Sequence, residues 1–171
     1  MAEAREMTRS ARVSQSEMTE LILPNDTNTL GNLLGGRIMH FIDLVAAMAA
    51  YRHARTHVVT ASMDHIDFIA PVHVGDFLIL KSTVNRGYRT SMEVGVKVWA
   101  ENATEGTHRH VASAYLTFVA VSAAGVPVLI PRLVFEDEEG ERRFADAGRR
   151  REQRQAELAR RREAGKLSPL P

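Results

Sequence analysis

The chain has 171 residues, of which 44% are hydrophobic and 25% are charged, and its formal net charge is +1. This length accommodates one domain with a full hydrophobic core, and the near-neutral charge points neither to nucleic acid nor to a membrane surface as an obligatory partner. The lack of cysteine excludes disulfides, a cysteine nucleophile and thiolate metal ligands, and no apolar run reaches the roughly 20 residues that a membrane span requires.

The N-terminal residues 1–17 are polar and aperiodic, and they lack the apolar core of a secretory signal peptide. We expect a flexible leader in this segment and a cytoplasmic location for the protein. The segment TELILP, residues 19–24, predicts a short strand that the proline ends. Residues 25–36, NDTNTLGNLLGG, are rich in Asn, Asp and Gly and predict a turn-forming loop.

A helix is predicted from Gly36 to Arg55, and because it is apolar on nearly all sides we expect it to be buried along most of its length. Asp43 interrupts this apolar surface. An unpaired buried carboxylate is unfavourable, so Asp43 lies on a hydrated edge, pairs with His40 on the same helical face, or serves a chemical function. The helix alone does not distinguish these alternatives.

Extended segments with a period of two follow the helix, at residues 57–69, 76–86, 91–102 and 109–122. Short connectors such as Gly87–Thr90 are those expected between antiparallel neighbours. One buried helix followed by four or five antiparallel strands predicts an α+β domain, which we assign to residues 18–124.

Residues 125–171 are predicted to be a C-terminal extension, with a charged helix from about Glu136 and a frayed end, KLSPLP. The simplest interpretation of the helix is a solvated element with ion pairs between its own turns. A second interpretation is that some of its arginines, at positions such as 149–151, bind phosphate groups. Nucleic-acid binding is disfavoured, because the basic segment lacks interleaved aromatic residues and contains acidic ones.

The histidines invite a search for a metal site. His108 and His110 fall in a predicted loop, where a solvated turn is the simpler explanation. Asp64, His65 and Asp67 lie close in sequence, but on a strand Asp64 faces away from the other two. Because a zinc site requires three or four protein ligands, we expect no metal.

The glycine pair Gly35–Gly36 stands where the helix begins. It offers bare backbone N–H groups at the positive end of the helix dipole, which suits an oxyanion or a phosphate. An equally good explanation is that the glycines only allow tight entry of the chain into the helix. Asn28, in the preceding loop, most simply stabilises its own turn.

The stretch DTNTLGNLLGGRIMHFID resembles the D-T-N-x-x-G-x-x-x-G-G-x-x-M-x-x-x-D signature of the hotdog-fold acyl-CoA thioesterases, a group that includes cytosolic brain-type acyl-CoA hydrolase and small bacterial relatives. Later stretches, among them VVTASMDHIDFIAPVHVGD and TSMEVGVKVWAE, are similar to the same family in the same order, so the resemblance covers about residues 18–155. It implies a single hotdog domain, in which an antiparallel sheet wraps a long central helix. It also implies hydrolysis of acyl-CoA to a carboxylic acid and CoA, without a separate cofactor. Arg37 departs from the family, where a bulky apolar residue is common after the glycine pair.

By this resemblance Asp43 is the catalytic carboxylate, acting as general base or nucleophile, and Asn28 orients the water or the thioester carbonyl. The backbone amides of Gly35 and Gly36 polarise that carbonyl. An alternative from another class is a non-catalytic acyl-CoA-binding or scaffold protein on the same fold. A hotdog dehydratase is disfavoured, because no histidine is placed with a carboxylate in the expected arrangement.

The turn at Arg89, Thr90 and Ser91 is a candidate site for the phosphates of CoA. A flexible glycine precedes it, and the arginine and two hydroxyls supply donors. The resemblance also favours CoA contacts near this turn. An ordinary hairpin with an exposed arginine explains the same residues nearly as well.

The spacing within the helix favours a homodimer. Gly36 and Asp43 lie about 10 Å apart along the axis at ~1.5 Å per residue, whereas amides and carboxylate must both come within about 3 Å of the reacting centre. Two antiparallel helices at a dyad bring the amides of one chain to the aspartate of the other. We therefore expect composite active sites in a homodimer, and the resemblance implies a hexamer built as a trimer of dimers.

Overall fold

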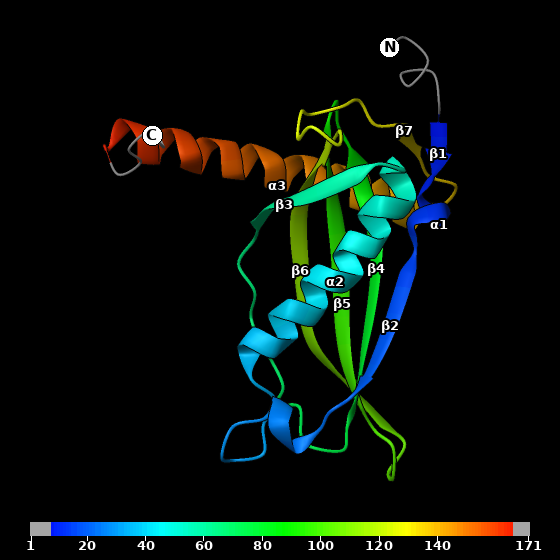
Figure 1. Ribbon diagram of the computed structural model, residues 1–171, viewed down its shortest axis with the longest axis vertical. Coiled ribbons are helices and arrows are strands. Elements are labelled where there is room, and N and C mark those ends of the chain that lie inside the picture. The colour runs from blue at the N-terminus through cyan, green and yellow to red at the C-terminus, as the bar shows by residue number, and fades with distance from the viewer. Residues whose placement is uncertain (1–7, 166–171) are drawn as a thin grey trace.

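The long helix α2 (Gly35–Ala54) packs against one face of a five-stranded antiparallel sheet in the computed structural model, which describes residues 8–165. The strands follow the order β2-β4-β5-β6-β3, with bounds Ser16–Leu21, Phe77–Gly87, Ser91–Asn102, Thr107–Val121 and His57–Met63. Figure 1 shows α2 in front of the sheet and a second long helix, α3 (Glu138–Glu163), behind it. The α+β layout predicted from the change of period is confirmed. We call the face that carries α2 the inner face of the sheet and the opposite one the outer face.

Alternation along the central strands places the hydrophobic core between the sheet and α2. The inward side chains of β4, β5 and β6 are buried, among them Leu78, Leu80, Met92, Val94, Val96, Leu116 and Phe118. On the helix, Ile42 and Val45 are fully buried together with three alanines. These small residues bring the helix backbone close to the sheet, and Ser82 Oγ donates to the Val45 carbonyl oxygen at 2.7 Å.

The segment expected to be a flexible leader is ordered from residue 8 onward, which corrects that prediction for residues 8–17. It forms β1 (Thr8–Ser10), α1 (Ala11–Ser14) and the start of β2, and β1 pairs in parallel with β7 (Arg132–Val134). The physical reason is Ser14, which is fully buried and whose Oγ accepts the Val84 amide N–H at 2.9 Å. Residues 1–7 and the predicted frayed end at 166–171 lie outside the described residues.

α2 is buried along most of its length, as expected, but only on the side that faces the sheet. Three large apolar side chains, Leu44, Met48 and Tyr51, form an exposed stripe, and Met39 is also exposed; the individual exposed fractions are 36% to 46%. By helix geometry the stripe lies on the side of α2 opposite the sheet, whereas Met39 lies further round the helix. A sequence that is apolar all round does not reveal which side its own sheet covers.

Other differences concern the strands. β3 ends at Met63, whereas the prediction extended the strand to residue 69; residues 64–70 form a loop instead. His108 and His110, expected in a loop, lie on β6.

None of the helices within residues 8–165 is long and apolar enough to cross a membrane.

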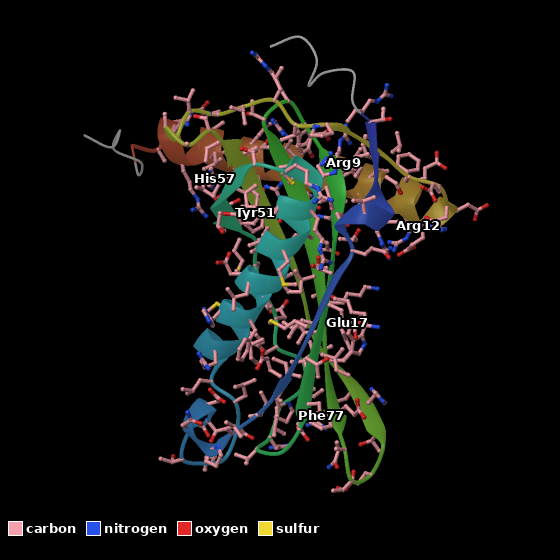
Figure 2. All side chains as sticks on the ribbon, turned by 45° about the vertical axis from the view of Figure 1, so that its right-hand side comes forward. Arg9, Arg12, Glu17, Tyr51, His57 and Phe77 are labelled. Atoms are coloured by element: carbon pink, nitrogen blue, oxygen red, sulfur yellow. The ribbon has the colours of Figure 1, made fainter. Side chains whose placement is uncertain are left out.

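His53 is a fully buried titratable side chain near the C-terminal end of α2. Its Nε2 lies 3.0 Å from the Pro131 carbonyl oxygen, and its Nδ1 has no hydrogen-bond partner in the described part of the chain. Burial lowers the pKa of His53; the hydrogen bond to Pro131 acts in the opposite direction, and the charge of Arg9 lowers the pKa further. Figure 2 shows Arg9 near the end of α2 that carries Tyr51.

We expect the stability of the fold to decrease as the pH falls below about 6.5, where histidine in the unfolded chain takes up a proton that folded His53 resists. Because the pKa of His53 is lowered in the folded state, the unfolded state binds more protons at low pH. The free energy of unfolding therefore decreases as the pH falls. The measurement is the Tm of wild type and of His53→Gln at pH 8 and pH 5.5. His53→Gln should lose less Tm between the two pH values, and equal losses would contradict the role of His53.

Candidate active site

Asp26 anchors the loop that precedes α2. Its side chain is buried: Oδ1 accepts Arg37 Nε at 2.9 Å and Oδ2 accepts the Leu23 amide N–H at 3.3 Å. The Leu34 amide donates to the Asp26 carbonyl oxygen at 3.1 Å. Arg37, the residue that departs from the family pattern, therefore fixes the loop to the first turn of the helix and also lies over the Phe41 ring, 4.9 Å from its centroid.

Asn28 lies at the exposed tip of this loop and organises its turn. Its Oδ1 accepts the amide N–H groups of Leu30 at 2.9 Å and Asn32 at 3.1 Å. This is the turn-stabilising role that the simpler interpretation predicted. The Nδ2 group donates to no acceptor within residues 8–165, so a fixed side chain presents an amide donor at the surface.

The start of α2 has open backbone donors. Leu34, at the N-cap, makes no side-chain capping bond, and the amides of Gly35 and Gly36 have no acceptor among the residues that the structure describes. A Cβ on Gly35 would lie 3.4 Å from the Phe68 ring, which comes from the loop after β3. This close approach favours glycine, and the two free amides at the positive helix end suit a polarised carbonyl oxygen.

Asp43 is held by a threonine and not by His40. Asp43 Oδ1 accepts the Thr60 hydroxyl at 2.8 Å, and the aspartate is half-buried at the border of the exposed stripe of α2. The His40 ring instead lies tilted toward Phe41, with centroids 5.7 Å apart. One carboxylate oxygen is thus fixed, while the other is available to a ligand.

Thr60 is a candidate site residue that the sequence interpretation missed. It lies on β3 opposite Phe118 of β6, so its side chain faces inward like that of Val58. A hydroxyl two residues after Val58, on the same face of the strand, was the available signal. The alternation of apolar and polar residues in the sequence does not reveal the irregularity between Thr60 and Ser62, which shifts the pairing register of the strand beyond it.

The chain brings part of the predicted site together. Asp26 and Arg37 join the loop of Asn28 to the helix start at Gly35 and Gly36. Asp43 lies about two turns further along α2, about 10 Å away by helix geometry, and no hydrogen bond links it to Asn28 within the described residues. Within one chain, therefore, the two groups of candidate residues remain apart.

The hairpin of Arg89, Thr90 and Ser91 lies at the other end of α2. A Cβ on Gly87, where β4 ends, would lie 3.6 Å from His53 Nε2, close to the helix C-terminus. The carbonyl oxygens of Arg89 and Thr90 accept amides of neighbouring segments, whereas the Arg89 side chain is exposed. Within one chain, this hairpin is far from the glycine pair.

The chain is similar to known proteins along most of its length. Residues 30–107 match the family model described as the thioesterase superfamily. A protein of Bacillus subtilis named uncharacterized acyl-CoA thioester hydrolase YkhA is 42% identical over 132 residues, which cover 77% of each chain. A solved hexameric acyl-CoA thioesterase is 38% identical, with a TM-score of 0.86, and the match covers 90% of this chain and 98% of that one.

The acyl-CoA hydrolase of Staphylococcus aureus, solved with butyryl-coenzyme A and coenzyme A, is 33% identical over 93% of this chain and 97% of its own, with a TM-score of 0.85. Other structures of that hydrolase carry substitutions named Asp43Ala, Asn28Ala and Thr60Ala, and the present chain has the same residue types at these numbers. The chain spans only 24% to 36% of several longer mammalian relatives.

These matches show that the chain belongs to the thioesterase superfamily, a class of thioester hydrolases. The expected hotdog fold, a central helix wrapped by an antiparallel sheet, is confirmed by the solved relatives. Three or more His, Asp or Glu side chains do not gather into a potential metal site anywhere in residues 8–165.

Proposed function

We propose that the protein hydrolyses acyl-CoA to a free carboxylic acid and CoA, with Asp43 as the catalytic carboxylate. The observation that carries the proposal is a half-buried aspartate in an apolar helix, oriented by the Thr60 hydroxyl at 2.8 Å. The named activities of the relatives, and the CoA complexes of one of them, support it. The test is thiol release from acyl-CoAs by wild type and Asp43→Asn.

The chemistry requires one carboxylate and a set of donors. With Oδ1 fixed by Thr60, Asp43 Oδ2 either takes a proton from the attacking water or attacks the thioester carbonyl to form an anhydride, which water then hydrolyses. The amides of Gly35 and Gly36 stabilise the developing oxyanion, and Asn28 Nδ2 orients the carbonyl or the water. The leaving thiol has a pKa of about 8 to 9, so the thiolate departs without a strong acid.

A homodimer completes this site. The exposed apolar stripe of α2 and the edge strand β3 are surfaces that a second copy covers, with the two α2 helices antiparallel across a dyad. This arrangement brings Asn28, Gly35 and Gly36 of one chain to the partner chain's Asp43. Because a solved relative is described as hexameric, we extend the proposal to a hexamer built as a trimer of dimers.

Mixed dimers test the composite site. Co-expressed Asn28→Ala and Asp43→Asn chains, each inactive alone, should regain about a quarter of wild-type activity, because half the dimers are mixed and each mixed dimer has one intact site of two. The measurement is thiol release by the whole co-expressed mixture, and the two-tag mixed dimer purified from it should reach about half of wild-type activity. If Asn28 and Asp43 of the same chain act together, every site carries a defect and the mixture stays inactive.

The hairpin residues Arg89, Thr90 and Ser91 are proposed to hold the CoA phosphates of a site formed with the partner chain. An antiparallel dimer moves the hairpin of one chain toward the glycine pair of the other. Arg89→Ala should raise the KM for acyl-CoA by about tenfold with kcat nearly unchanged, since a lost phosphate contact weakens substrate and transition state equally. A decrease in kcat at constant KM would contradict this assignment.

The alternative function is a non-catalytic acyl-CoA-binding or scaffold role on the same fold. Wild-type protein that binds acyl-CoA without releasing thiol would establish it. A cytoplasmic location remains part of our proposal, and fractionation of cells that express the tagged chain tests it.

A further inference from the structure

Thr60 depends on an edge strand for its position. Its hydroxyl donates to Asp43 Oδ1 at 2.8 Å, and its strand, β3, is the last in the sheet and pairs only with β6. A register shift interrupts the pairing after Thr60, and beyond it the strand continues for only two paired residues, Ser62 and Met63. Figure 1 shows the chain leaving the sheet there and running toward the start of α2. The strand that orients Asp43 is therefore supported by few backbone contacts beyond this point.

The register shift turns Asp64 toward the outer face of the sheet. Thr60 pairs with Phe118, a core residue of β6, and faces inward. In a regular strand Ser62 and Asp64 would point to the same side as Thr60. Ser62 instead pairs with Thr117, which alternates with Phe118 along β6, so the residues beyond the shift point to the opposite side. Asp64 thereby reaches the face of the sheet that α3 covers.

Arg154 of α3 binds Asp64 on the outer face. Its Nη1 lies 2.6 Å from Asp64 Oδ2, and the exposed fractions of the two side chains are 23% and 19%. The same guanidinium lies 3.4 Å from Oε2 of Glu93, which is fully buried and also binds Arg150. Because water screens this pair less than a surface pair, breaking it costs more than breaking an exposed one. The end of β3 is thus tied through Arg154 to the buried charges beneath α3.

The segment after β3 has few other anchors. The Asp64 amide makes a backbone hydrogen bond to β6 at 2.9 Å, and the next such bond along the chain is donated by the Ile69 amide. Residues 65–68 form none within the part of the chain that the structure describes. In the same part of the chain, the bond between Asp64 and Arg154 is the only side-chain hydrogen bond that links residues 61–70 to another segment. Removing this bond therefore loosens the end of β3 and the loop beyond it.

We propose that Asp64 and Arg154 are positioning residues for the proposed hydrolysis, on which this inference rests. The ion pair fixes the end of β3, and the fixed strand holds the Thr60 hydroxyl where it orients the Asp43 carboxylate. Both residues of the pair lie on the outer face, so the sheet separates them from the Asp43 site and they act only through Thr60. The charged helix α3 thereby contributes to the chemistry at Asp43, although α2 and α3 lie on opposite faces of the sheet (Figure 1).

The test is thiol release from acyl-CoA by Asp64→Asn, a change that removes the carboxylate charge and leaves Arg154 in contact with Glu93. We expect kcat to fall by about tenfold and KM to stay within about twofold, because a displaced catalytic carboxylate loses interactions made in the transition state. Arg154→Gln should have the same effect, and the double variant should lose no more than the larger single loss. The matched control is Asp67→Asn, whose ion pair in the same loop is largely exposed, and which should keep wild-type kcat.

A Thr60→Ala background separates positioning from a general loss of stability. With the hydroxyl absent, Asp64→Asn should lower kcat by less than about twofold, since the ion pair acts only through Thr60. An equal fold-loss of kcat with and without the Thr60 hydroxyl would overturn the proposal. Wild-type hydrolysis that Asp64→Asn leaves unchanged would overturn this inference alone, whereas a wild type that hydrolyses no acyl-CoA would overturn the proposed function and this inference with it.

Discussion

Asp43→Asn should lower kcat for acyl-CoA hydrolysis by about 10² to 10⁴, because general-base or nucleophilic action requires a carboxylate and an amide supplies neither. Asparagine has nearly the same shape, and its Oδ1 still accepts the Thr60 hydroxyl that Asp43 accepts at 2.8 Å. Folding should therefore persist, with a Tm close to that of wild type. The measurement is thiol release from acyl-CoAs ranging from acetyl to stearoyl, which also reveals the preferred chain length.

A matched control is Asp67→Asn, in the exposed loop after β3, where Asp67 Oδ1 lies 2.9 Å from His65 Nε2 and both side chains are largely solvated. This variant should retain wild-type kcat. Unaltered hydrolysis by Asp43→Asn would show that Asp43 is a structural residue and that other residues carry out the hydrolysis. A wild type that binds acyl-CoA and never releases thiol would favour the non-catalytic alternative for the whole protein.

The region of Asp43 and Asn28 shows which features of the fold and of the candidate site can be predicted from the sequence. The period of two along β4, β5 and β6, and the apolar run of α2, follow from local patterns that burial imposes, so the layers were predictable. The roles expected for the loop of Asn28 and for the start of α2 rested on the resemblance to the acyl-CoA thioesterases. The exposed stripe of α2 was not predictable, because apolar side chains look alike in the sequence whether their own sheet or a partner chain covers them.

Contacts between segments that are distant in the sequence were the second feature that could not be predicted. Thr60 meets Asp43 only because β3 returns along the helix at the edge of the sheet. The alternation of β5 predicts that Glu93 faces away from the core, and it does, but the outer face there is covered and Glu93 is fully buried. Its partner Arg150 is 57 residues away, and a charged helix gives no local sign of which arginines bind outside it.

Glu93→Ala should produce the largest loss of stability, about 3 to 5 kcal/mol, because it removes one partner of a buried charge network. Glu93 Oε1 accepts Arg150 Nη2 at 2.6 Å, and Oε2 lies 3.4 Å from Arg154 Nη1, which also binds Asp64 at 2.6 Å. The side chains of Arg150 and Arg154 are only 20% and 23% exposed, so water replaces the lost carboxylate poorly. The measurement is the urea midpoint and slope of unfolding.

Glu157→Ala is the matched control, because its pair with Arg161 lies on the same helix with both side chains more than half exposed. It should change the free energy of unfolding by less than about 0.5 kcal/mol. Arg150→Ala combined with Glu93→Ala should cost less than the sum of the two single changes, since the second substitution removes a charge that the first left unpaired. Additive losses, or a Glu93→Ala loss no larger than that of Glu157→Ala, would mean that α3 is held by its apolar contacts instead.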